Sequence, residues 1–482
     1  RERDLILEAF GRACRGERQW VMISGCAGVG KTALMDELRS VVQQEQGYFV
    51  TGRYEQYQGN VPYRGVVRVV TNLIRHILAG PAEGIATCRK RLQEGLGTYG
   101  GLMTEFIPLL KVLTGGFPPL RKMTPLEKAN RFFHTFEILV QLLTQFLQPL
   151  VVFLDDLQWM DSASVPLIRS FKEARGRILF VGAYRSEEVD QDHPVHRLLH
   201  SLQDGGIPLK RLALESLDLD NTAALVEGIL GQNNLEELVN SVYQQTAGNP
   251  LYVKQFLQDA YEAGELYFSP QELCWKYERK LVTPEVPETV TEVVINRLKR
   301  LPPKTVGALK RAASLGVQFS LSLLARCLGQ SLSHTRSLLR PALTMGIILE
   351  DGETGGAEAE VYRFFHDRVR EAVFSLFDPG ERAQVAYEVG QVLLDDLSTG
   401  QDVFQGVDLL NLAEGLLQDE GQRLQVARLN LRAARQAKAA FALGAALQYL
   451  EAGIRLLPTH CWEQYYDLTA GLYLEYYRCK FL

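Results

Sequence analysis

The chain has 482 residues, 46% of them hydrophobic and 23% charged, and its formal net charge is −5. A single hydrophobic core stops growing near roughly 250–300 residues, so this length predicts roughly three or four domains. The slight negative charge excludes a protein whose overall field attracts nucleic acid or acidic lipid.

The seven cysteines show neither C-x-x-C nor any Cys/His ligand spacing. They favour reduced thiols in a cytoplasmic protein over a disulfide framework. No membrane span is expected, because no hydrophobic run approaches the ~20 residues that a bilayer requires. The chain opens inside a pattern at Arg1 without a signal peptide and stops at "YRCKFL" without a polar tail, so we expect a segment of a longer protein.

Five short hydrophobic runs rich in β-branched residues precede residue 215. They lack polar alternation, which is typical of parallel strands buried on both faces of a sheet. Helical patterns lie between them, so residues 1–214 are expected to form a doubly wound α/β domain of the P-loop NTPase type. An insert at roughly 55–148 is mostly helical by pattern. The five expected strands are 20–25, 48–53, 150–156, 178–185 and 207–214.

Strand signals fade after residue 215, and three further regions follow. Residues 215–296 are expected to form an all-α lid, in which "AGNP" separates two helices. Residues 297–378 read as three helices and a hairpin, the order of a winged helix. Residues 379–482 carry alanine and leucine at helical spacing and predict a purely helical region.

Part of this last region has spacings like those of one tetratricopeptide unit, carried by Ala434, Ala446, Gly453 and Pro458. An ordinary helical hairpin explains the same spacings equally well. The end of the chain is aromatic, and an exposed face there would serve as a partner surface rather than a cofactor site. The residues of that face are Trp462, Tyr466, Tyr473 and Tyr477.

The segment "GCAGVGKT", Gly25 to Thr32, matches the P-loop pattern G-x-x-x-x-G-K-[ST]. It follows an expected strand and opens an expected helix, where backbone N–H groups can surround phosphates. Lys31 would contact the β- and γ-phosphates, and the Thr32 hydroxyl would ligate Mg²⁺. A glycine-rich turn with an exposed lysine is the plainer alternative. The expected nucleotide-binding residues of this segment are Gly25, Gly28, Val29, Gly30, Lys31, Thr32 and Ala33.

The segment "LVVFLDDLQWMD" ends a buried strand in two carboxylates, which are unfavourable there unless a cation is bound nearby. Asp155 would hold Mg²⁺ directly or through water. Asp156 would orient or deprotonate the attacking water. The alternative role for an acid at this place is to cap the next helix, and Asp161 is the better candidate for that.

Arg185 ends the fourth expected strand, and ligands of doubly wound sheets bind beyond the carboxyl ends of the strands. An arginine at this place can reach the γ-phosphate and report its presence. A surface salt bridge with Glu187 or Glu188 is the alternative. Lys31, Asp156 and Arg185 are therefore the expected catalytic residues.

These motifs together resemble the STAND class of signal-transduction ATPases, within the AAA+-related P-loop group. The closest resemblance is to ATPase segments of very large bacterial signalling proteins, between a Ser/Thr kinase domain and GAF plus histidine-kinase domains. "RERDL" resembles the family's opening with Asp4 in place of Glu, and "LDDLQWMD" its Walker B segment. "GNPLYVKQFL" resembles its G-x-P sensor, "FHDRVREAVFSL" its winged-helix His-Asp signature, and "LNLRAARQAKAAFALGAALQYLEAGIRLL" its helical repeats.

The resemblance implies further roles. Pro250 would pack near the adenine, His366 would touch the β-phosphate of ADP, and Arg1 would line the adenine pocket. Without the resemblance, a histidine such as His366 is more often structural. The lid region has no second arginine at a recognisable sensor position, unlike motor-type relatives, which favours a switch over a cycling machine.

A winged helix can bind DNA, but the charges here disfavour it. The candidate recognition helix offers only His334, Arg336 and Arg340. Acids in the following hairpin would repel the phosphates on which duplex affinity largely depends. We therefore expect no direct contact with nucleic acid. The acids are Glu350, Asp351, Glu353, Glu358 and Glu360.

The sequence favours a slow ATPase switch that uses ATP or ADP with Mg²⁺. ADP would hold the chain closed, and ATP would open it and permit self-association. A signal protein or ligand would act at the C-terminal helices, and attached kinase or sensor domains would receive the output. Two alternatives stay open: a transcription regulator whose DNA-binding domain lies outside this chain, and a scaffold that binds ATP without hydrolysing it.

Overall fold

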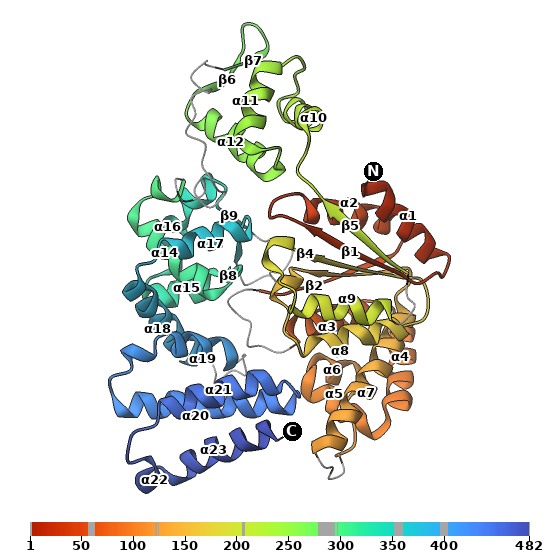
Figure 1. The fold of residues 1–482 in the computed structure, drawn as a ribbon, viewed down its shortest axis with the longest axis vertical. Helices are drawn as coiled ribbons and strands as arrows, with labels where there is room; N and C mark the ends of the chain where they lie inside the picture. Colours follow the sequence, from red (N-terminus) through yellow and green to blue (C-terminus); the bar gives the residue numbers. More distant parts are fainter. Residues whose placement is uncertain are drawn as a thin grey trace. The chain divides into compact units, whose positions relative to one another are not determined.

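The computed structural model describes residues 2–55, 63–120, 123, 125–204, 208–277, 295, 297–350, 360–395 and 403–481. The chain divides into two compact units, Arg1–Pro284 and Glu285–Leu482, both drawn in Figure 1. The division falls inside the region expected to form the lid. Four residues discussed above lie outside the described part: Arg1, Asp351, Glu353 and Glu358.

The first unit is built on a five-stranded sheet of order β2-β3-β4-β1-β5, in which every neighbouring pair is parallel. All five strands arise from the predicted hydrophobic runs, and residues of the three central strands are almost wholly buried. The predicted P-loop NTPase-like fold is thereby confirmed. The strands are β1 (Gln19–Gly25), β2 (Tyr48–Arg53), β3 (Leu150–Asp155), β4 (Ile178–Tyr184) and β5 (Leu209–Leu214).

Helices cover both faces of this sheet (Figure 1). On one face α1 (Glu2–Cys14) and α2 (Lys31–Gln44) bury Phe10 and Leu38 against Val21 and its neighbours on the strands. On the other face Trp20 stacks on Phe180 with ring centroids 3.9 Å apart. Three helices lie on that second face: α3 (Arg64–Leu78), α8 (Ser164–Ser170) and α9 (Pro194–Gln203). The sheet is therefore doubly wound, as predicted.

The insert between β2 and β3 is helical, as its pattern indicated. Its core contains an aromatic cluster in which Phe106 contacts Tyr63 and Phe132 edge to face, with ring centroids 5.3 and 5.1 Å apart. Beyond α3 it comprises α4 (Ala82–Leu96), α5 (Gly100–Phe106), α6 (Leu109–Thr114) and α7 (Pro125–Phe146).

The lid region begins with three helices, α10 (Leu219–Leu230), α11 (Glu236–Thr246) and α12 (Pro250–Glu262). It then departs from the all-α prediction, because β6 (Leu266–Ser269) and β7 (Cys274–Tyr277) form an antiparallel hairpin. Aromatic contacts stabilise the hairpin: the Trp275 ring lies 5.7 Å from that of Phe268 and 5.9 Å from that of Tyr261. Four-residue strands are too short for alternation of polar and apolar residues to reveal them.

The second unit begins with helices packed on a three-stranded antiparallel sheet of order β8-β10-β9. The three helices and the strand pair were predicted, whereas the three-residue β8 was not. Phe319 of β8 packs against Tyr362 and Phe364 of β10. The elements are α14 (Pro303–Leu315), β8 (Gln318–Ser320), α15 (Leu321–Leu328), α16 (Leu332–Thr344), β9 (Ile348–Glu350), β10 (Val361–Phe364) and α17 (Asp367–Ser375).

The rest of the second unit is helical. Helices α20 and α21 pack together, and Gly453 of α21 allows close approach, since a Cβ there would lie 3.2 Å from Cβ of Asn430 on α20 and 2.8 Å from Cδ2 of Leu472 on α23. Asn411 and Asn430 exchange hydrogen bonds of 2.9 and 2.8 Å between α19 and α20. The helices are α18 (Pro379–Asp395), α19 (Val403–Leu412), α20 (Glu420–Ala439), α21 (Leu443–Arg455), α22 (Cys461–Gln464) and α23 (Tyr466–Lys480).

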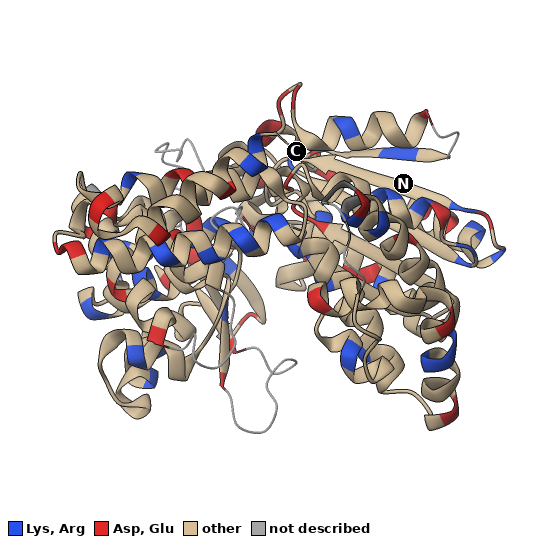
Figure 2. Ribbon diagram, turned by 90° about the horizontal axis from the view of Figure 1, so that it is seen from below, with Lys and Arg blue, Asp and Glu red and all other residues tan. Residues whose placement is uncertain are grey.

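Charged residues of both signs occur on the helices of both units (Figure 2). None of the helices in the described part of the chain combines the length and the apolar content needed to cross a membrane.

Candidate functional site

The P-loop joins β1 to α2 at the carboxyl end of the sheet. Gly28 and Gly30 have φ values of 79° and 108°, a backbone conformation that residues with a Cβ rarely adopt. Lys31 begins α2, and its Nζ donates to the backbone oxygens of Gly25 and Cys26 at 2.7 and 2.8 Å. The loop therefore folds around its own lysine in the way a phosphate-binding loop requires, with the ammonium held at the mouth of the loop.

The ammonium of Lys31 is poorly solvated, since only 9% of the residue is exposed. This burial lowers the pKa of Lys31, and the charge of Arg185 lowers it further, whereas Asp155 and Asp156 act in the opposite direction. Lys31, Asp155 and Asp156, which the sequence analysis predicted as site residues, are therefore close enough to interact electrostatically. An anionic phosphate at this place would compensate the desolvated charge.

Asp155 is the last residue of β3 and is half-buried. Its Oδ1 accepts a hydrogen bond from the backbone N–H of Asp156 at 2.9 Å. Burial, and secondly the neighbouring charge of Asp156, raise the pKa of Asp155 to about 6. The pKa values of Asp155 and of its neighbour Asp156 are thus shifted in opposite directions, the first upward and the second downward.

Asp156 is almost completely buried and has a left-handed backbone, with φ 54°. Its Oδ2 accepts hydrogen bonds from Nε of Arg53 at 2.9 Å, with Nη2 also at 2.9 Å. Its Oδ1 accepts from Nε2 of Gln158 at 2.8 Å and lies 3.8 Å from Nε of Arg185. Burial alone would raise the pKa of Asp156, but Arg53 and Arg185 hold it below its ordinary value.

Arg53 is a site residue that the sequence analysis missed. It ends β2, and the sheet register places it beside Asp155 on β3. No motif includes Arg53, and the sequence alone does not show that the second expected strand lies next to the third.

Arg185 follows β4 and is only 3% exposed, so it is no surface residue. Its Nη1 donates to Oε1 of Glu188 at 2.7 Å, and its guanidinium lies 4.8 Å from the centre of the Trp159 ring. The ion pair considered as the alternative reading is therefore present, but it is buried and belongs to the same network as Asp156. To reach a γ-phosphate, the guanidinium would have to exchange these partners.

The lid contacts the P-loop directly through the "GNP" segment. Asn249 caps α12 by accepting a hydrogen bond from the N–H of Leu251 at 3.1 Å. Its Nδ2 donates to the backbone oxygen of Ala27 at 2.9 Å. Pro250 is the first residue of α12 and is half-buried, one residue away from this contact.

His366 belongs to the second unit. It caps α17, where its Nδ1 accepts a hydrogen bond from the N–H of Arg368 at 3.1 Å. The structural role that a histidine often has at such a position is therefore present. Its expected contact with ADP stays a prediction.

The other selected residues lie in one region of the first unit. The carboxyl ends of β3, β4 and β1 are neighbours in the sheet and carry the acidic pair, the arginine and the P-loop. Asp161 accepts the N–H of Ser164, the first residue of α8, at 2.9 Å, although Ala163 and not Asp161 holds the N-cap position that the sequence suggested for it. The P-loop residues are Gly25, Gly28, Val29, Gly30 and, in the first turn of α2, Lys31, Thr32 and Ala33.

The donor set fits a magnesium ion held jointly by protein and nucleotide. Among the described residues, no three His, Cys, Asp or Glu side chains are arranged to hold a metal ion. Mg²⁺ in nucleotide sites commonly takes one or two protein oxygens and completes its shell with phosphates and water. Thr32 and Asp155 carry oxygen atoms of this kind, and their binding of Mg²⁺ stays a prediction.

A parallel sheet with a P-loop after its first strand and an acidic pair after a nearby strand defines a P-loop ATPase domain. Comparison with known families agrees, because residues 1–181 match the family model described as "AAA ATPase domain".

Two curated proteins are similar to this chain. The hybrid signal transduction histidine kinase G of Dictyostelium discoideum is 22% identical over 609 aligned residues, which cover 100% of this chain and 18% of that protein. The peroxide stress-activated histidine kinase mak2 of Schizosaccharomyces pombe is 23% identical over 283 residues, or 55% of this chain and 12% of that protein. The chain thus spans less than a fifth of the length of either relative.

Among solved structures, a signal transduction ATPase with numerous domains (STAND) from Pyrococcus horikoshii, which has a tetratricopeptide repeat sensor, is similar. It is 14% identical, and the match covers 99% of this chain and 63% of that chain with a TM-score of 0.47.

Proposed function

We propose that this chain is the nucleotide switch of a larger signalling protein of the STAND class. It binds ATP or ADP with Mg²⁺ and hydrolyses ATP slowly. The observation that carries the proposal is the convergence of Lys31, Asp155 and Arg185 on the carboxyl end of one sheet. The two curated relatives are named as histidine kinases, and each is several times longer than this chain, which supports attached kinase domains.

The proposed reaction is transfer of the γ-phosphoryl group to water. Lys31 binds the β- and γ-phosphates, and the N–H groups of the P-loop surround them. Thr32 and Asp155 hold Mg²⁺, which when bound neutralises charge on the phosphate oxygens. Asp156 orients the attacking water, and Arg185 contacts the γ-phosphate.

Slow hydrolysis follows from the contacts of Asp156. Both of its oxygens are engaged, one by Arg53 and the other by Gln158. A carboxylate that already accepts these bonds and is held charged in an ion-pair network has little remaining capacity for water. Rearrangement of the Arg53 pair would free Oδ2 for water and speed hydrolysis, which suits a protein that must stay in the ATP state for some time.

The switch itself is an equilibrium between closed and open forms. ADP favours the closed form of the ATPase domain (1–214), lid (215–296), winged-helix domain (297–378) and tetratricopeptide-like region (379–482). His366 and Pro250 contribute to the ADP complex. ATP favours the open form, which self-associates and biases the attached kinase domains. Nucleotide shifts this equilibrium only by its different affinity for the two forms.

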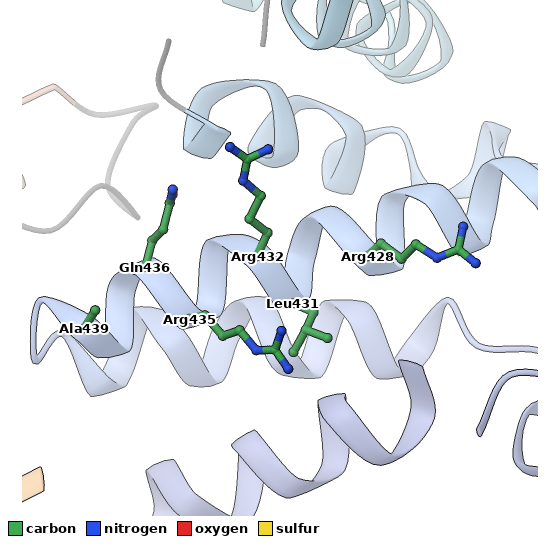
Figure 3. Close-up of a pocket in the computed structure, with 6 residues that line it drawn as sticks. All are labelled: Arg428, Leu431, Arg432, Arg435, Gln436 and Ala439. Atoms are coloured by element: carbon green, nitrogen blue, oxygen red, sulfur yellow. The ribbon is translucent and has the colours of Figure 1, made fainter. Parts of the chain in front are cut away.

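The C-terminal helices offer a place for the signal. A hollow of about 450 Å³ runs along one face of α20, and Figure 3 shows long polar side chains projecting from that face. Arg428 and Arg432 take part in no ion pair within residues 403–481, and Arg435 shares Glu475 with other cations. This excess of positive charge suits an anionic ligand or an acidic segment of a partner. The hollow is lined by Arg428, Leu431, Arg432, Arg435, Gln436 and Ala439.

The aromatic face near the end of the chain is a second candidate for partner contact. Trp462, Tyr466 and Tyr477 are exposed, and Tyr473 stacks on Trp462 with ring centroids 5.5 Å apart. Contact with DNA is disfavoured by a further observation. Arg336, one of three basic residues on α16, is paired with Glu360 and is therefore already neutralised.

Two measurements on the purified chain test the switch, and the first separates it from the non-hydrolysing scaffold. Single-turnover hydrolysis of ATP distinguishes the switch from a scaffold that only binds nucleotide. Light scattering with ATP or ADP tests self-association, with Lys31→Ala as the binding-deficient variant and Lys90→Ala, an exposed lysine on α4, as the control. ATP-dependent assembly that persists in Lys31→Ala would refute the switch.

A further inference from the structure

The side chain of Asn249 uses both ends of its amide, and each end serves a different part of the first unit. Oδ1 accepts the N–H of Leu251 and caps α12, while Nδ2 donates to the carbonyl oxygen of Ala27 in the P-loop. Only this orientation of the amide satisfies both partners, because Leu251 offers a donor and Ala27 an acceptor. The residue is only 6% exposed, so water does not replace either bond easily.

The P-loop side of this contact is tightly packed. A Cβ on Gly28 would lie 2.8 Å from Oδ1 of Asn249 and 2.8 Å from Cβ of Leu251. The N–H of Ala27 donates to Oε1 of Glu187 at 3.4 Å. The backbone carbonyl of Ala27 is therefore hydrogen-bonded to Asn249 of the lid, and its N–H to Glu187 in the turn after β4.

Phosphate binding acts on the same stretch of backbone. A P-loop binds phosphate by turning its N–H groups inward, so a bound anion restrains the orientation of the peptide units that it contacts. Ala27 lies between Gly25 and Gly28, and glycine at Gly28 with φ 79° permits the adjoining peptide to rotate. A phosphate that fixes this peptide therefore holds the Ala27 carbonyl where it accepts from Asn249, whereas rotation of the peptide lengthens or breaks that bond.

We propose that Asn249 is the positioning residue through which occupancy of the P-loop sets the placement of α12 in the lid. The proposal rests on the nucleotide switch proposed above and names the contact that transmits it. The bond between Nδ2 and Ala27 holds the lid helix on the loop, and its loss lets the lid move away and the nucleotide leave. Asn249 thus acts through Ala27, whereas the sequence motif had pointed to Pro250.

Asn249→Asp is the informative variant, because its carboxylate keeps the cap of α12 but removes the donor to Ala27. Asn249→Ser is a second variant, with a capping oxygen and no amide. Asp218→Ala is the control, since Asp218 caps lid helix α10 through the N–H of Asn221 at 2.8 Å. Two quantities are measured on the full chain: the dissociation rate of fluorescent ADP, and hydrogen exchange of the α12 amides with and without ADP.

In the wild type, ADP should slow exchange in α12. Both Asn249 variants should still bind ADP but release it about tenfold faster, the factor that corresponds to losing one hydrogen bond. Protection of α12 should then no longer depend on ADP, and Asp218→Ala should release ADP at the wild-type rate.

Three results would overturn the proposal, and they differ in whether the proposed nucleotide switch also fails. Asn249 variants with wild-type ADP release and ADP-dependent protection refute the contact and leave the switch standing. Equal acceleration in Asp218→Ala shows that any weakening of the lid speeds ADP release, which also refutes a specific role of the contact. A wild-type chain that binds no ADP removes the proposed function itself.

Discussion

The pairing of Arg53 with Asp156 should be the strongest single electrostatic contact at the site. We predict that Arg53→Met destabilises the first unit, because it leaves Asp156 charged in a place where its side chain is only 7% exposed. Removing one partner of a buried ion pair costs about 3–5 kcal/mol. Arg53 itself is 33% exposed, and Gln158 and Arg185 remain near the carboxylate, so the expected loss is about 2–3 kcal/mol.

The assay is thermal unfolding of the full chain without nucleotide, followed by a probe in the first unit. The expected loss corresponds to a decrease of roughly 4–10 °C in the midpoint for a unit of this size. Arg3→Met is the control, because Arg3 contacts Glu37 at 2.6 Å, closer than the 2.9 Å of Arg53 and Asp156, where both side chains are more than half exposed. It should lower stability by less than about 1 kcal/mol.

A double-mutant cycle isolates the pair from other effects of the substitution. In an Asp156→Asn background the charge is gone, so Arg53→Met should then cost much less than in the wild type. Equal costs in the two backgrounds, or a cost no larger than that of Arg3→Met, would refute the reasoning that the buried charge of Asp156 depends on Arg53.

Three further predictions concern other parts of the chain. The pKa of Asp155 is about 6 in the folded chain against an ordinary 3.8, so the folded state holds the proton longer and stability should fall as pH rises through this window. In metal-free buffer above pH 6, Asp155→Asn should raise the free energy of unfolding by about 1–2 kcal/mol relative to the wild type. Chemical unfolding measures this difference, and a difference that does not change with pH would contradict the prediction. If His366 contacts ADP, both His366→Ala and His366→Asn should accelerate ADP release, whereas acceleration in the alanine variant alone would mean that the side chain only caps α17. Charge reversal of Arg428 and Arg432 to glutamate should abolish binding of a polyglutamate peptide measured by fluorescence anisotropy, and undiminished binding would exclude the α20 hollow as an anionic site.

The sheet could be predicted because each strand is a continuous hydrophobic run, and burial on both faces leaves that signature in the residues themselves. The P-loop could be predicted because its glycines and lysine are adjacent in sequence. Arg53 could not, since its role depends on β2 lying next to β3, and strand order is not written in any local pattern. The "GNP" motif directed attention to Pro250, yet Asn249 makes the contact with the P-loop.

Short strands were the other feature of the fold that the sequence did not reveal. The strands β6, β7 and β8 have four residues or fewer, too few positions to show a period of two. β9 and β10 are equally short, but the turn-linked pattern after the third helix of the winged-helix region revealed them. The strands β6, β7 and β8 form because aromatic residues such as Trp275 and Phe319 find partners across the hairpin or sheet. Tertiary contact, rather than local preference, decides such strands.

Equilibrium binding of ADP and ATP to the purified chain and to Lys31→Ala, with Mg²⁺ present, tests the nucleotide site most directly. The wild type should bind both nucleotides, and Lys31→Ala should lose most of that affinity while unfolding at a similar temperature. A wild-type chain that binds neither nucleotide, or a Lys31→Ala chain that binds both as tightly, would contradict the assignment of this loop as a triphosphate site.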